Sequence, residues 1–576
     1  MTMQNADIAD IFNRIADLLE IEGENPFRVR AYRNAARTVS DLSHPVAAMI
    51  SAGEPLTELP GIGKDLAGKI REIVETGSLP QLVELEKKTP PALSLLLKIP
   101  GLGPKRVKAL QQALGIANIE DLKTAAKEGK IKDIKRFGEK IEQSIMEALE
   151  EWSGQEQRFT LYEAEQRADD LLDFLRKAPG VGQVTVAGSF RRRKETVGDL
   201  DILATCDADE ALMAHFVSYD GVKKVLSQGT TRSTVILRSG LQVDVRAVPP
   251  ESYGAALHYF TGSKAHNIAV RQRAVRRQLK INEYGVFEGD RRLAGETEEE
   301  VYAQVDLPYI EPELRENNGE LEAAEEGRLP GLIELAAIRG DLHAHTDATD
   351  GRATLSDMAE AARSRGYRYL GITEHSKRVT MAFGLDAEAL ASHIDRIDRL
   401  NETFGDDFTL LKGIEVDILE DGSLDLPDDI LARLDFRICS VHYYHHLPLE
   451  RQTERILRAM DNPLCTILGH PTGRLIGKRR PYEADMQRIL EAARDTGCVM
   501  EINAQPDRLD LHDLHCRMAK EMGVKIAIST DAHNTMEFGF MRLGVDQARR
   551  GWIEPEDVIN TYDLPRLREF FILRTK

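Results

Sequence analysis

Histidine and carboxylate residues gather in the last part of the sequence, where eleven of the fifteen histidines follow residue 340. His343 and His345 stand two residues apart, so at the end of a strand they point the same way and can bind one metal ion together. Further candidate ligands fall at or near the ends of expected strands: Asp350, His375, Glu415, His442, His470, Asp531 and His533. One buried histidine is most often structural, but this many nitrogen and carboxylate ligands without cysteine favour a cluster of Zn²⁺ or Mn²⁺ ions.

A second set of carboxylates lies near the middle of the chain. Asp199 and Asp201 alternate on one expected strand and so face one side of it, and Asp244 lies in another expected strand. Before them, the Gly188-Ser189 turn offers backbone and hydroxyl donors to a triphosphate. Three carboxylates that hold two Mg²⁺ ions suit attack of a primer 3′-hydroxyl on an α-phosphate. The combination favours nucleotidyl transfer over the alternative, a solvated acidic strand edge.

A short glycine turn occurs twice near the start of the chain, each copy with an apolar residue and Pro before it and Lys after it. The turns contain Gly61, Gly63 and Lys64 in the first copy, and Gly101, Gly103 and Lys105 in the second. Each turn is expected to open a helix, where free backbone N–H groups and the positive helix end can bind a DNA phosphate. One such turn is more often only a turn, but two copies with the same flanks favour DNA binding.

The elements that must position these residues change character along the chain. Residues 1–150 place apolar residues three and four apart, which predicts helices. From about residue 181 the apolar residues alternate, which predicts strands. After residue 340, strand-like runs alternate with amphipathic helical stretches, a pattern typical of a parallel sheet closed into a barrel with its site at the strand ends. Residues 296–334 are acidic with little periodic signal, and predict a solvated linker able to separate the two halves.

The net charge of −19 conceals an uneven distribution. Residues 1–295 sum to about +1, whereas residues 296–330 and 331–576 each sum to about −10, so the overall acidity does not exclude nucleic acid as a partner of the first half. No apolar run of about 18 residues occurs and the start is acidic, so we expect a cytoplasmic protein with no membrane partner. The five cysteines show no C-x-x-C spacing and predict reduced, buried thiols.

The two glycine turns resemble the helix-hairpin-helix motif, which binds DNA without reading its sequence. The segment from Gly23 to Arg37, with the first turn, resembles the lyase domain of the family X DNA polymerases. There a lysine forms a Schiff base with the sugar of an abasic site, and Lys69 falls at its position. Asp65 and Asn34 occupy positions where relatives have lysines. The alternative is a DNA-end-binding module in which Lys69 only contacts a phosphate.

The central carboxylates and their surroundings resemble the nucleotidyltransferase core of the same family. The resemblance implies that Asp199, Asp201 and Asp244 are catalytic metal ligands. It further implies a nucleotide pocket formed by Gly188, Ser189, Arg192, Tyr259, Phe260, Gly262 and Asn267. Arg271 is expected to contact the template, within a basic stretch that is otherwise explained as a solvated helix face.

The order HxH, D, H, E, H, H, DxH resembles the polymerase and histidinol phosphatase (PHP) domain, a distorted barrel that hydrolyses phosphoesters. The resemblance implies three metal positions: His343, His345, Glu415 and Asp531 for the first; Glu415, His442 and His470 for the second; Asp350, His375 and His533 for the third. Arg474 and Lys478, which follow His470, are expected to bind the substrate phosphate.

Together the two halves resemble the bacterial and archaeal family X DNA polymerases, which implies a multidomain protein. Its expected parts are an all-α lyase-like domain (1–85), a fingers-like helical domain (86–150), an α+β palm (151–250) and thumb (251–295), the acidic linker (296–334) and an α/β PHP barrel (335–576). The implied function is gap filling in DNA repair, including base excision repair, by a monomer that uses dNTPs, gapped or primer-template DNA and Mg²⁺ or Mn²⁺. The PHP domain is expected to be a 3′–5′ exonuclease with up to three Mn²⁺ or Zn²⁺ ions, with abasic-site cleavage as an option. Two alternatives are a PHP phosphatase for small molecules and a silent PHP scaffold.

Overall fold

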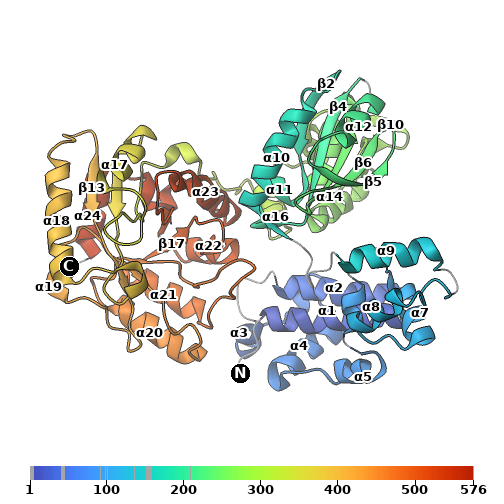
Figure 1. Cartoon of the computed structure of the whole chain (residues 1–576), viewed down its shortest axis with the longest axis horizontal. Coiled ribbons are helices and arrows are strands. Elements are labelled where there is room, and N and C mark those ends of the chain that lie inside the picture. Colours follow the sequence, from blue (N-terminus) through green and yellow to red (C-terminus); the bar gives the residue numbers. More distant parts are fainter. Residues whose placement is uncertain are drawn as a thin grey trace. The chain divides into compact units, whose positions relative to one another are not determined.

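The computed structural model describes residues 5–40, 46–90, 92–97, 99, 102–134, 137–150, 158–207 and 209–574. The chain divides into two compact units, Met1–Gln157 and Arg158–Lys576. Figure 1 shows the helices and strands of each unit.

The first unit is helical, as the apolar spacing predicts. In α1, Ile8, Phe12, Ile15 and Leu19 recur three and four residues apart and are buried, which gives the helix one apolar face. The unit contains two apolar clusters, one between residues 8 and 82 and the other mainly between residues 93 and 149. Its helices are α1 (Asn5–Glu22), α2 (Pro26–Ser40), α3 (Val46–Ser51), η1 (Leu56–Glu58), α4 (Lys64–Thr76), α5 (Pro80–Lys88), α6 (Leu93–Leu96), α7 (Pro104–Leu114), α8 (Ile119–Lys127) and α9 (Glu139–Glu150).

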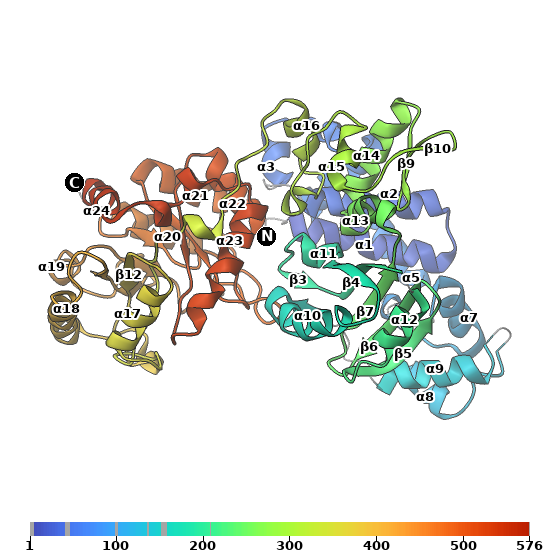
Figure 2. The same cartoon turned by 90° about the horizontal axis from the view of Figure 1, so that it is seen from above.

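The second unit begins with a five-stranded sheet of order β2-β4-β7-β6-β5. The parallel pairing of β4 with β7 sets Asp201 directly opposite Asp244. Helices α10 and α12 share an apolar core with this sheet (Figure 2), while α13 contributes to a separate cluster with Leu203. The elements are β1 (Phe159–Thr160), α10 (Leu161–Leu175), β2 (Val181–Val186), α11 (Gly188–Arg191), β3 (Thr196–Val197), β4 (Asp199–Cys206), α12 (Asp209–Val217), β5 (Val222–Gln228), β6 (Arg232–Leu237) and β7 (Gln242–Ala247).

Residues 250–334 form a small α+β region that corrects one expectation. The acidic segment 296–334 is not a solvated linker, because Val301, Tyr302, Ile310 and Leu314 are buried in a common core with the preceding helices and strands. Its elements and those before it are η2 (Pro250–Ser252), α13 (Tyr253–Thr261), α14 (Lys264–Arg276), β8 (Lys280–Asn282), β9 (Gly285–Glu288), β10 (Arg291–Ala294), α15 (Glu298–Ala303), η3 (Pro312–Leu314) and α16 (Glu320–Glu325).

Residues 335–574, called the barrel region below, contain parallel strands in sheets of three and five, ordered β11-β12-β13 and β14-β15-β16-β17-β18. Parallel bridges from Ala344 to Ala532 and from His375 to Glu415 join the two sheets at both edges, which closes a distorted barrel. Between β13 and β14 the chain passes Gly413, where a Cβ would lie 2.8 Å from Thr373 and 2.9 Å from Phe436, so glycine permits this close approach.

Helices surround the barrel strands, as Figure 1 shows for α18, α20 and α21. The strands are β11 (Gly340–Asp341), β12 (Tyr369–Ile372), β13 (Thr409–Lys412), β14 (Glu415–Asp417), β15 (Ile438–Ser440), β16 (Ile467–Leu468), β17 (Val499–Asn503) and β18 (Ile526–Ser529). The helices are η4 (Leu335–Ala337), α17 (Leu355–Ser364), η5 (Thr380–Ala382), α18 (Ala387–Asn401), α19 (Asp428–Leu431), α20 (Leu449–Asp461), α21 (Met486–Thr496), α22 (Asp513–Glu521), η6 (Glu537–Phe540), α23 (Met541–Arg550), η7 (Pro555–Asp557), η8 (Ile559–Thr561) and α24 (Leu564–Arg574).

The barrel region packs directly on the first sheet region, which comprises the five-stranded sheet and its helices in residues 158–247. Leu161 of α10 is buried with Leu509 and Leu543 of the barrel region, and Tyr162 packs edge to face on Phe540 with ring centroids 5.1 Å apart. In the part of the chain that the structure describes, no helix is long and apolar enough to cross a membrane.

Candidate active sites

The first candidate site lies where the turn after β2 meets the start of β4. Gly188 has φ +63°, and a Cβ there would lie 2.9 Å from Asp201 Oδ2. Only glycine therefore allows the turn to approach this carboxylate so closely.

Asp201 and Asp244 face each other but differ in their electrostatics. Burial, and then the nearby charges of Asp199 and Asp244, raise the pKa of Asp201 to about 6. Burial also acts to raise the pKa of Asp244, but hydrogen bonds from Thr234, Arg232 and other neighbours lower it overall. The charges of Asp199 and Asp244 thus disfavour ionisation of Asp201, and a bound divalent cation would relieve this repulsion, although the oxygens of the three carboxylates do not all lie within 4.8 Å of one another in the described structure.

The expected nucleotide-pocket residues lie around the same turn. Arg192 donates to the backbone carbonyl of Thr261, and its Nη1 would lie 3.3 Å from a Cβ at Gly262. The Asn267 amide donates to the Tyr259 carbonyl at 2.7 Å, while its buried Oδ1 has no hydrogen-bond partner in the described structure. An unpartnered amide oxygen is available to a ligand.

An arginine side chain lies over each of the two aromatic rings of this pocket. The guanidinium of Arg271 lies 5.7 Å from the ring centroid of Tyr259, and that of Arg246 lies 4.5 Å from that of Phe260. Ser189 lies in α11 between Gly188 and the arginines.

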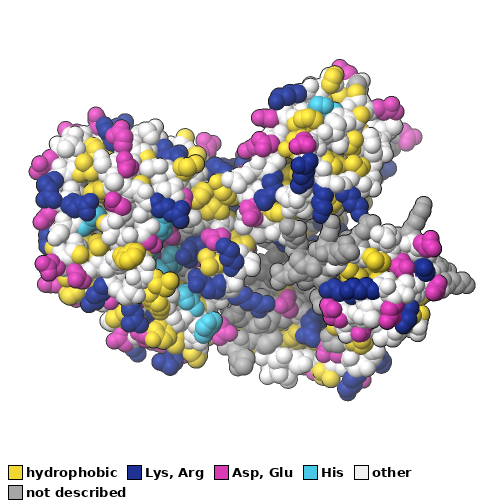
Figure 3. Space-filling model, viewed as in Figure 1, with side chains coloured by type: hydrophobic (Ala, Val, Ile, Leu, Met, Phe, Trp, Pro, Cys, Tyr) yellow, Lys and Arg dark blue, Asp and Glu magenta, His cyan; other side chains and the backbone are white. Residues whose placement is uncertain are grey.

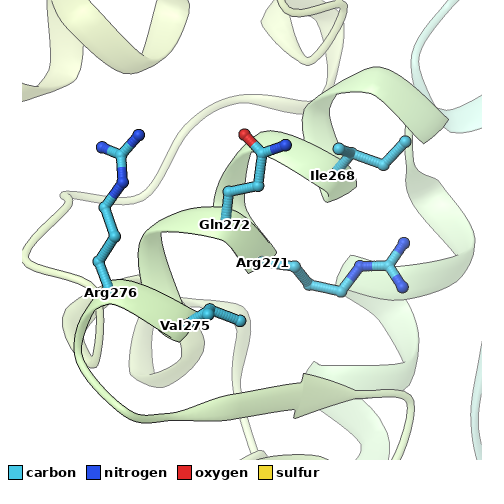
Figure 4. A pocket seen from close by; sticks show the side chains of 5 residues that line it. All are labelled: Ile268, Arg271, Gln272, Val275 and Arg276. Atoms are coloured by element: carbon cyan, nitrogen blue, oxygen red, sulfur yellow. The ribbon is translucent and has the colours of Figure 1, made fainter.

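One face of α14 presents cationic and apolar side chains to the surface. A shallow pocket there is lined by Ile268, Arg271, Gln272, Val275 and Arg276, at helical spacings of three and four residues (Figure 4). Val275 is 69% and Ile268 40% exposed, so two apolar side chains lie beside the guanidinium groups on this face. The arrangement suits the sugars and phosphates of nucleic acid.

The glycine turns of the first unit open two helices. Gly61 has φ +74°, and Gly63 and Gly103 are the N-cap residues of α4 and α7, where no side chain caps the free N–H groups. Lys64 and Lys105 lie in the first turns of these helices and are exposed. Gly101 lies outside the described residues.

Lys69 does not have the environment of an amine nucleophile. Its Nζ lies 2.5 Å from Asp65 Oδ2 and 5.1 Å from the ring centroid of Tyr32. Burial acts to lower the pKa of Lys69, but the hydrogen bonds to Asp65 and Tyr32 raise it overall. A raised pKa keeps the amine protonated, which opposes Schiff-base formation.

The second candidate site lies at the carboxyl ends of the barrel strands. Three groups of side chains place their ligand atoms within 4.8 Å of one another: His345, Asp350, His375 and His533; His343, His345 and Glu415; and His375, Glu415 and His442. Two expected ligands outside these groups lie beside them, since His470 Nε2 is 2.9 Å from Glu415 Oε1 and Asp531 Oδ1 is 3.0 Å from His345 Nε2. Figure 3 shows histidine side chains reaching the surface of the C-terminal region beside Lys and Arg side chains.

Buried polar atoms at this site are not satisfied by the described protein groups. Both ring nitrogens of His345, Nε2 of His343 and Oδ1 of Asp531 are buried without an aligned hydrogen bond. His345 Nε2 and Asp531 Oδ1 lie 3.0 Å apart, and neither has a hydrogen-bond partner in the described structure, so both atoms are available to a shared cation. Native proteins rarely leave such atoms unpaired, so the donor set fits divalent cations.

Buried carboxylates that we did not predict orient the histidines. Glu501 lies 2.7 Å from His343 Nδ1, and Asp417 lies 3.2 Å from His442 Nδ1. His533 Nδ1 lies 2.8 Å from the backbone carbonyl of Asp531. Each contact leaves the opposite nitrogen, Nε2, for a metal. In the sequence, the feature that indicates a special role for Glu501 is its position as an acidic residue within an apolar strand, VMEIN (residues 499–503).

The charges of this cluster also suit cations. Burial acts to raise the pKa of Glu415 and of Asp531, but neighbouring histidines hold both well below the usual range. Burial, His375 and His533 lower the pKa of His345 to about 3, so this ring is neutral. Burial also acts to lower the pKa of His375, but Glu415 and Asp350 outweigh this effect and raise the pKa to about 10. Metal binding there must displace a proton.

Of the two cations expected to bind phosphate after His470, Arg474 contacts another region of the chain, and Lys478 pairs with a residue that lines the pocket beside the metal ligands. Arg474 is buried and bonds Glu195 at 2.7 Å, and Lys478 pairs with Asp507 at 3.1 Å. A pocket beside the ligands instead contains Arg352 and Arg508, and Nη1 of Arg508 is buried without a partner in the described structure. These two arginines are better placed for a substrate phosphate.

Comparisons with known proteins cover the whole chain. Family models match residues 3–79 (helix-hairpin-helix domain), 93–151 (SAM-like helix-hairpin-helix tandem), 256–316 (DNA polymerase beta thumb) and 341–505 (PHP domain). The DNA polymerase/3′-5′ exonuclease PolX of Bacillus subtilis (strain 168) is 39% identical over 572 residues, which is 99% of each chain. A probable phosphatase of Thermoanaerobacter sp. (strain X514) is 31% identical over 246 residues, 40% of this chain and 93% of that protein. A probable phosphatase of Acetivibrio thermocellus is 28% identical over 34% of this chain and 81% of its own length.

Proposed function

This chain belongs to the family X DNA polymerases that carry a C-terminal PHP domain, and we propose that it fills gaps in DNA during repair and trims the same 3′ ends as a 3′–5′ exonuclease. The expected substrates are gapped or primer-template DNA and dNTPs, acted on by a monomer. The observation that carries the proposal is that two separate carboxylate and histidine constellations lie within one compact unit that is related along its whole length to such an enzyme.

In the polymerase site, Asp199, Asp201 and Asp244 are proposed to hold Mg²⁺ or Mn²⁺, which supplies charge neutralisation at the α-phosphate. Gly188 brings backbone donors next to Asp201, Ser189 and Arg192 bind the triphosphate, and Tyr259, Phe260, Gly262 and Asn267 enclose the nucleotide. Arg271 and its neighbours on α14 contact the template strand. Gly61, Gly63 and Lys64, with Gly101, Gly103 and Lys105, are proposed to bind backbone phosphates away from the chemistry.

In the PHP site, His343, His345, Asp350, His375, Glu415, His442, His470, Asp531 and His533 are proposed to hold up to three Mn²⁺ or Zn²⁺ ions. Such ions activate water and stabilise charge on phosphorus. Glu501 and Asp417 keep the rings of His343 and His442 in the tautomers that bind metal. Arg352 and Arg508 hold the phosphate next to the cluster.

A small-molecule phosphatase is the second candidate for the PHP domain. The probable phosphatases match only the C-terminal 40% of the chain or less, whereas the PolX protein matches all of it. This difference in coverage favours DNA as the substrate.

A 5′-labelled primer on gapped DNA tests both sites at once. Asp201→Ala should lower extension by several orders of magnitude and leave shortening largely intact, because a shared metal ligand is lost only from the polymerase site. Changing His343 and His345 together to Ala should do the reverse. Hydrolysis of phosphate monoesters without any shortening of DNA would move the PHP assignment to the small-molecule alternative.

For Lys69, the protonated environment supports the phosphate-contact alternative over lyase chemistry. Borohydride treatment with a 5′-deoxyribose phosphate substrate should therefore trap no complex that depends on Lys69. A covalent complex in the wild type that disappears in Lys69→Ala would restore the lyase assignment.

A further inference from the structure

The turn that carries Arg192 is held by contacts from the PHP domain. Arg193, the residue after Arg192, lies 3.5 Å from Asp546 of α23, and Glu195 bonds Arg474 at 2.7 Å. Arg550, the last residue of α23, donates to the backbone carbonyl of Arg192 at 2.7 Å. The nucleotide-binding turn of one catalytic domain therefore rests on a helix of the other.

Glu316 lies between the two domains and faces several cations. Its Oε1 is 3.1 Å from Arg192 Nε, 3.2 Å from Arg550 Nη1 and 3.8 Å from Lys194 Nζ. Burial acts to raise the pKa of Glu316, but Lys194, Arg550 and Arg192 lower it overall, so the carboxylate is ionised. One oxygen is thus shared between the expected triphosphate ligand Arg192 and the PHP residue Arg550.

Arg550 is almost completely buried, with 2% of its side chain exposed. Besides the Arg192 carbonyl and Glu316, it bonds Asp513 of the PHP domain. A buried guanidinium with this many fixed acceptors is held in one place, because its donors form a rigid planar fork. The Arg550 guanidinium is therefore a fixed, buried charge.

We propose that Arg550 is a positioning residue for DNA synthesis: it fixes the backbone of the Arg192 turn and shares the Glu316 carboxylate, which weakens the pairing of Glu316 with Arg192 and so favours binding of the incoming nucleotide's triphosphate by Arg192. The proposal rests on the assignment of Arg192 to triphosphate binding. It makes the PHP domain a structural part of the polymerase nucleotide pocket, in addition to its own hydrolytic site.

The physical reason is that Arg192 and Arg550 share one carboxylate, that of Glu316. Without Arg550, Glu316 lacks a major counter-charge and pairs more closely with Arg192, which is its nearest remaining cation. The triphosphate then has to displace Glu316 before it can bind. The carbonyl of Arg192 also loses its fixed donor, so the turn is less well ordered.

The test measures single-nucleotide insertion on gapped DNA by the full-length protein at varied dNTP concentration. Arg550→Gln should raise KM for the dNTP about tenfold, the size of one charge-assisted contact, with kcat and 3′–5′ shortening close to wild type. The matched control is Arg549→Gln on the same helix. Arg549 forms an ion pair with Glu313 at 2.7 Å, and no hydrogen bond or ion pair of the described structure joins it to the turn, so KM should not change.

A double variant separates competition from a general loss of packing. Glu316→Gln in the Arg550→Gln background should bring KM back toward the wild-type value, because the carboxylate that captures Arg192 is gone. A merely structural role for Arg550 predicts no recovery. Unchanged KM in Arg550→Gln, with shortening intact, overturns the proposal.

Two further variants make the outcome decisive. If Arg550→Gln loses both activities, Arg550→Lys keeps the charge opposite Glu316, so its KM should stay near the wild-type value. A rise in that KM as large as the rise in Arg192→Ala, with shortening intact, overturns the charge competition. Arg192→Ala tests the underlying assignment: if its KM equals that of wild type, the role of Arg192 itself fails. If KM rises in Arg192→Ala but not in Arg550→Gln, only the positioning role fails.

Discussion

At the scale of single residues, the ionised Asp201 carboxylate lowers the stability of the fold. Its pKa is about 6 in the folded chain against 3.8 for a free aspartate, because it is buried beside Asp199 and Asp244. Folding therefore favours the protonated form, and above about pH 6 the ionised carboxylate destabilises the fold unless a cation is bound.

We predict that Asp201→Asn stabilises the second unit at pH 8 in the presence of a chelator, by up to about 3 kcal/mol, while it lowers primer extension. The gain should shrink as the pH falls from 6 toward 4, because wild-type Asp201 then takes up a proton. Urea unfolding at pH 8 and pH 4.5 measures both points. Equal stabilities at pH 8 would show that the carboxylates do not repel each other.

The candidate ligands of the PHP site could be predicted from sequence because strand ends and ligand types are local features. The roles of their supporting residues could not, since the contacts of Glu501 with His343 and of Asp417 with His442 join residues distant in the chain, although an acidic residue in an apolar strand marks each position as unusual. Arg474 was misassigned for a related reason: it follows His470 in sequence, but its side chain bonds Glu195 of another domain. A role that depends on contacts between distant parts of the chain cannot be read from the spacing of residues along the sequence.

At the scale of elements, segment 296–334 shows how composition misleads. Its acidic composition predicts a solvated segment, but Glu298 bonds the buried Arg315 and Arg191, and Glu320 accepts from the buried His266. Burial acts to raise the pKa of Glu298, but Arg315 and Arg191 lower it to about 2. Acidic residues whose partners lie elsewhere in the chain are therefore compatible with a packed core. The helical first unit and the barrel, with strong periodicity, were predictable.

Helices α4 and α7 share the geometry of a backbone anion site, with glycine N-caps and lysine in the first turn. We predict that Lys105→Gln weakens binding to gapped DNA regardless of sequence and lowers the salt slope of binding by about one. Lys123→Gln on α8 is the control, since Lys123 pairs with Glu120 at 2.9 Å on the same helix. Fluorescence anisotropy across a salt series measures both proteins, and equal slopes for the two variants would contradict phosphate contact by the second hairpin.

At the scale of the whole molecule, the two catalytic regions form one compact unit, Arg158–Lys576, joined by apolar contacts and ion pairs. The first sheet region and the PHP domain therefore stabilise each other. The 296–334 segment contributes Glu313 and Glu316 to this junction, as partners of Arg549 and Arg550.

We predict that residues 158–576, expressed alone, keep extension and shortening of primer-template DNA but bind gapped DNA more weakly, because both hairpins lie in the first unit. Residues 335–576 alone should fold less stably, because Leu509 and Leu543 become exposed and the buried Arg550 loses Glu316 and the Arg192 carbonyl. Removing partners of a buried charge costs about 3–5 kcal/mol, which corresponds to a melting temperature lower by on the order of 10 °C. Calorimetry of both proteins with saturating Mn²⁺ measures the difference. If the PHP transition occurs at the same temperature in each, the domains are energetically independent and the junction only tethers them.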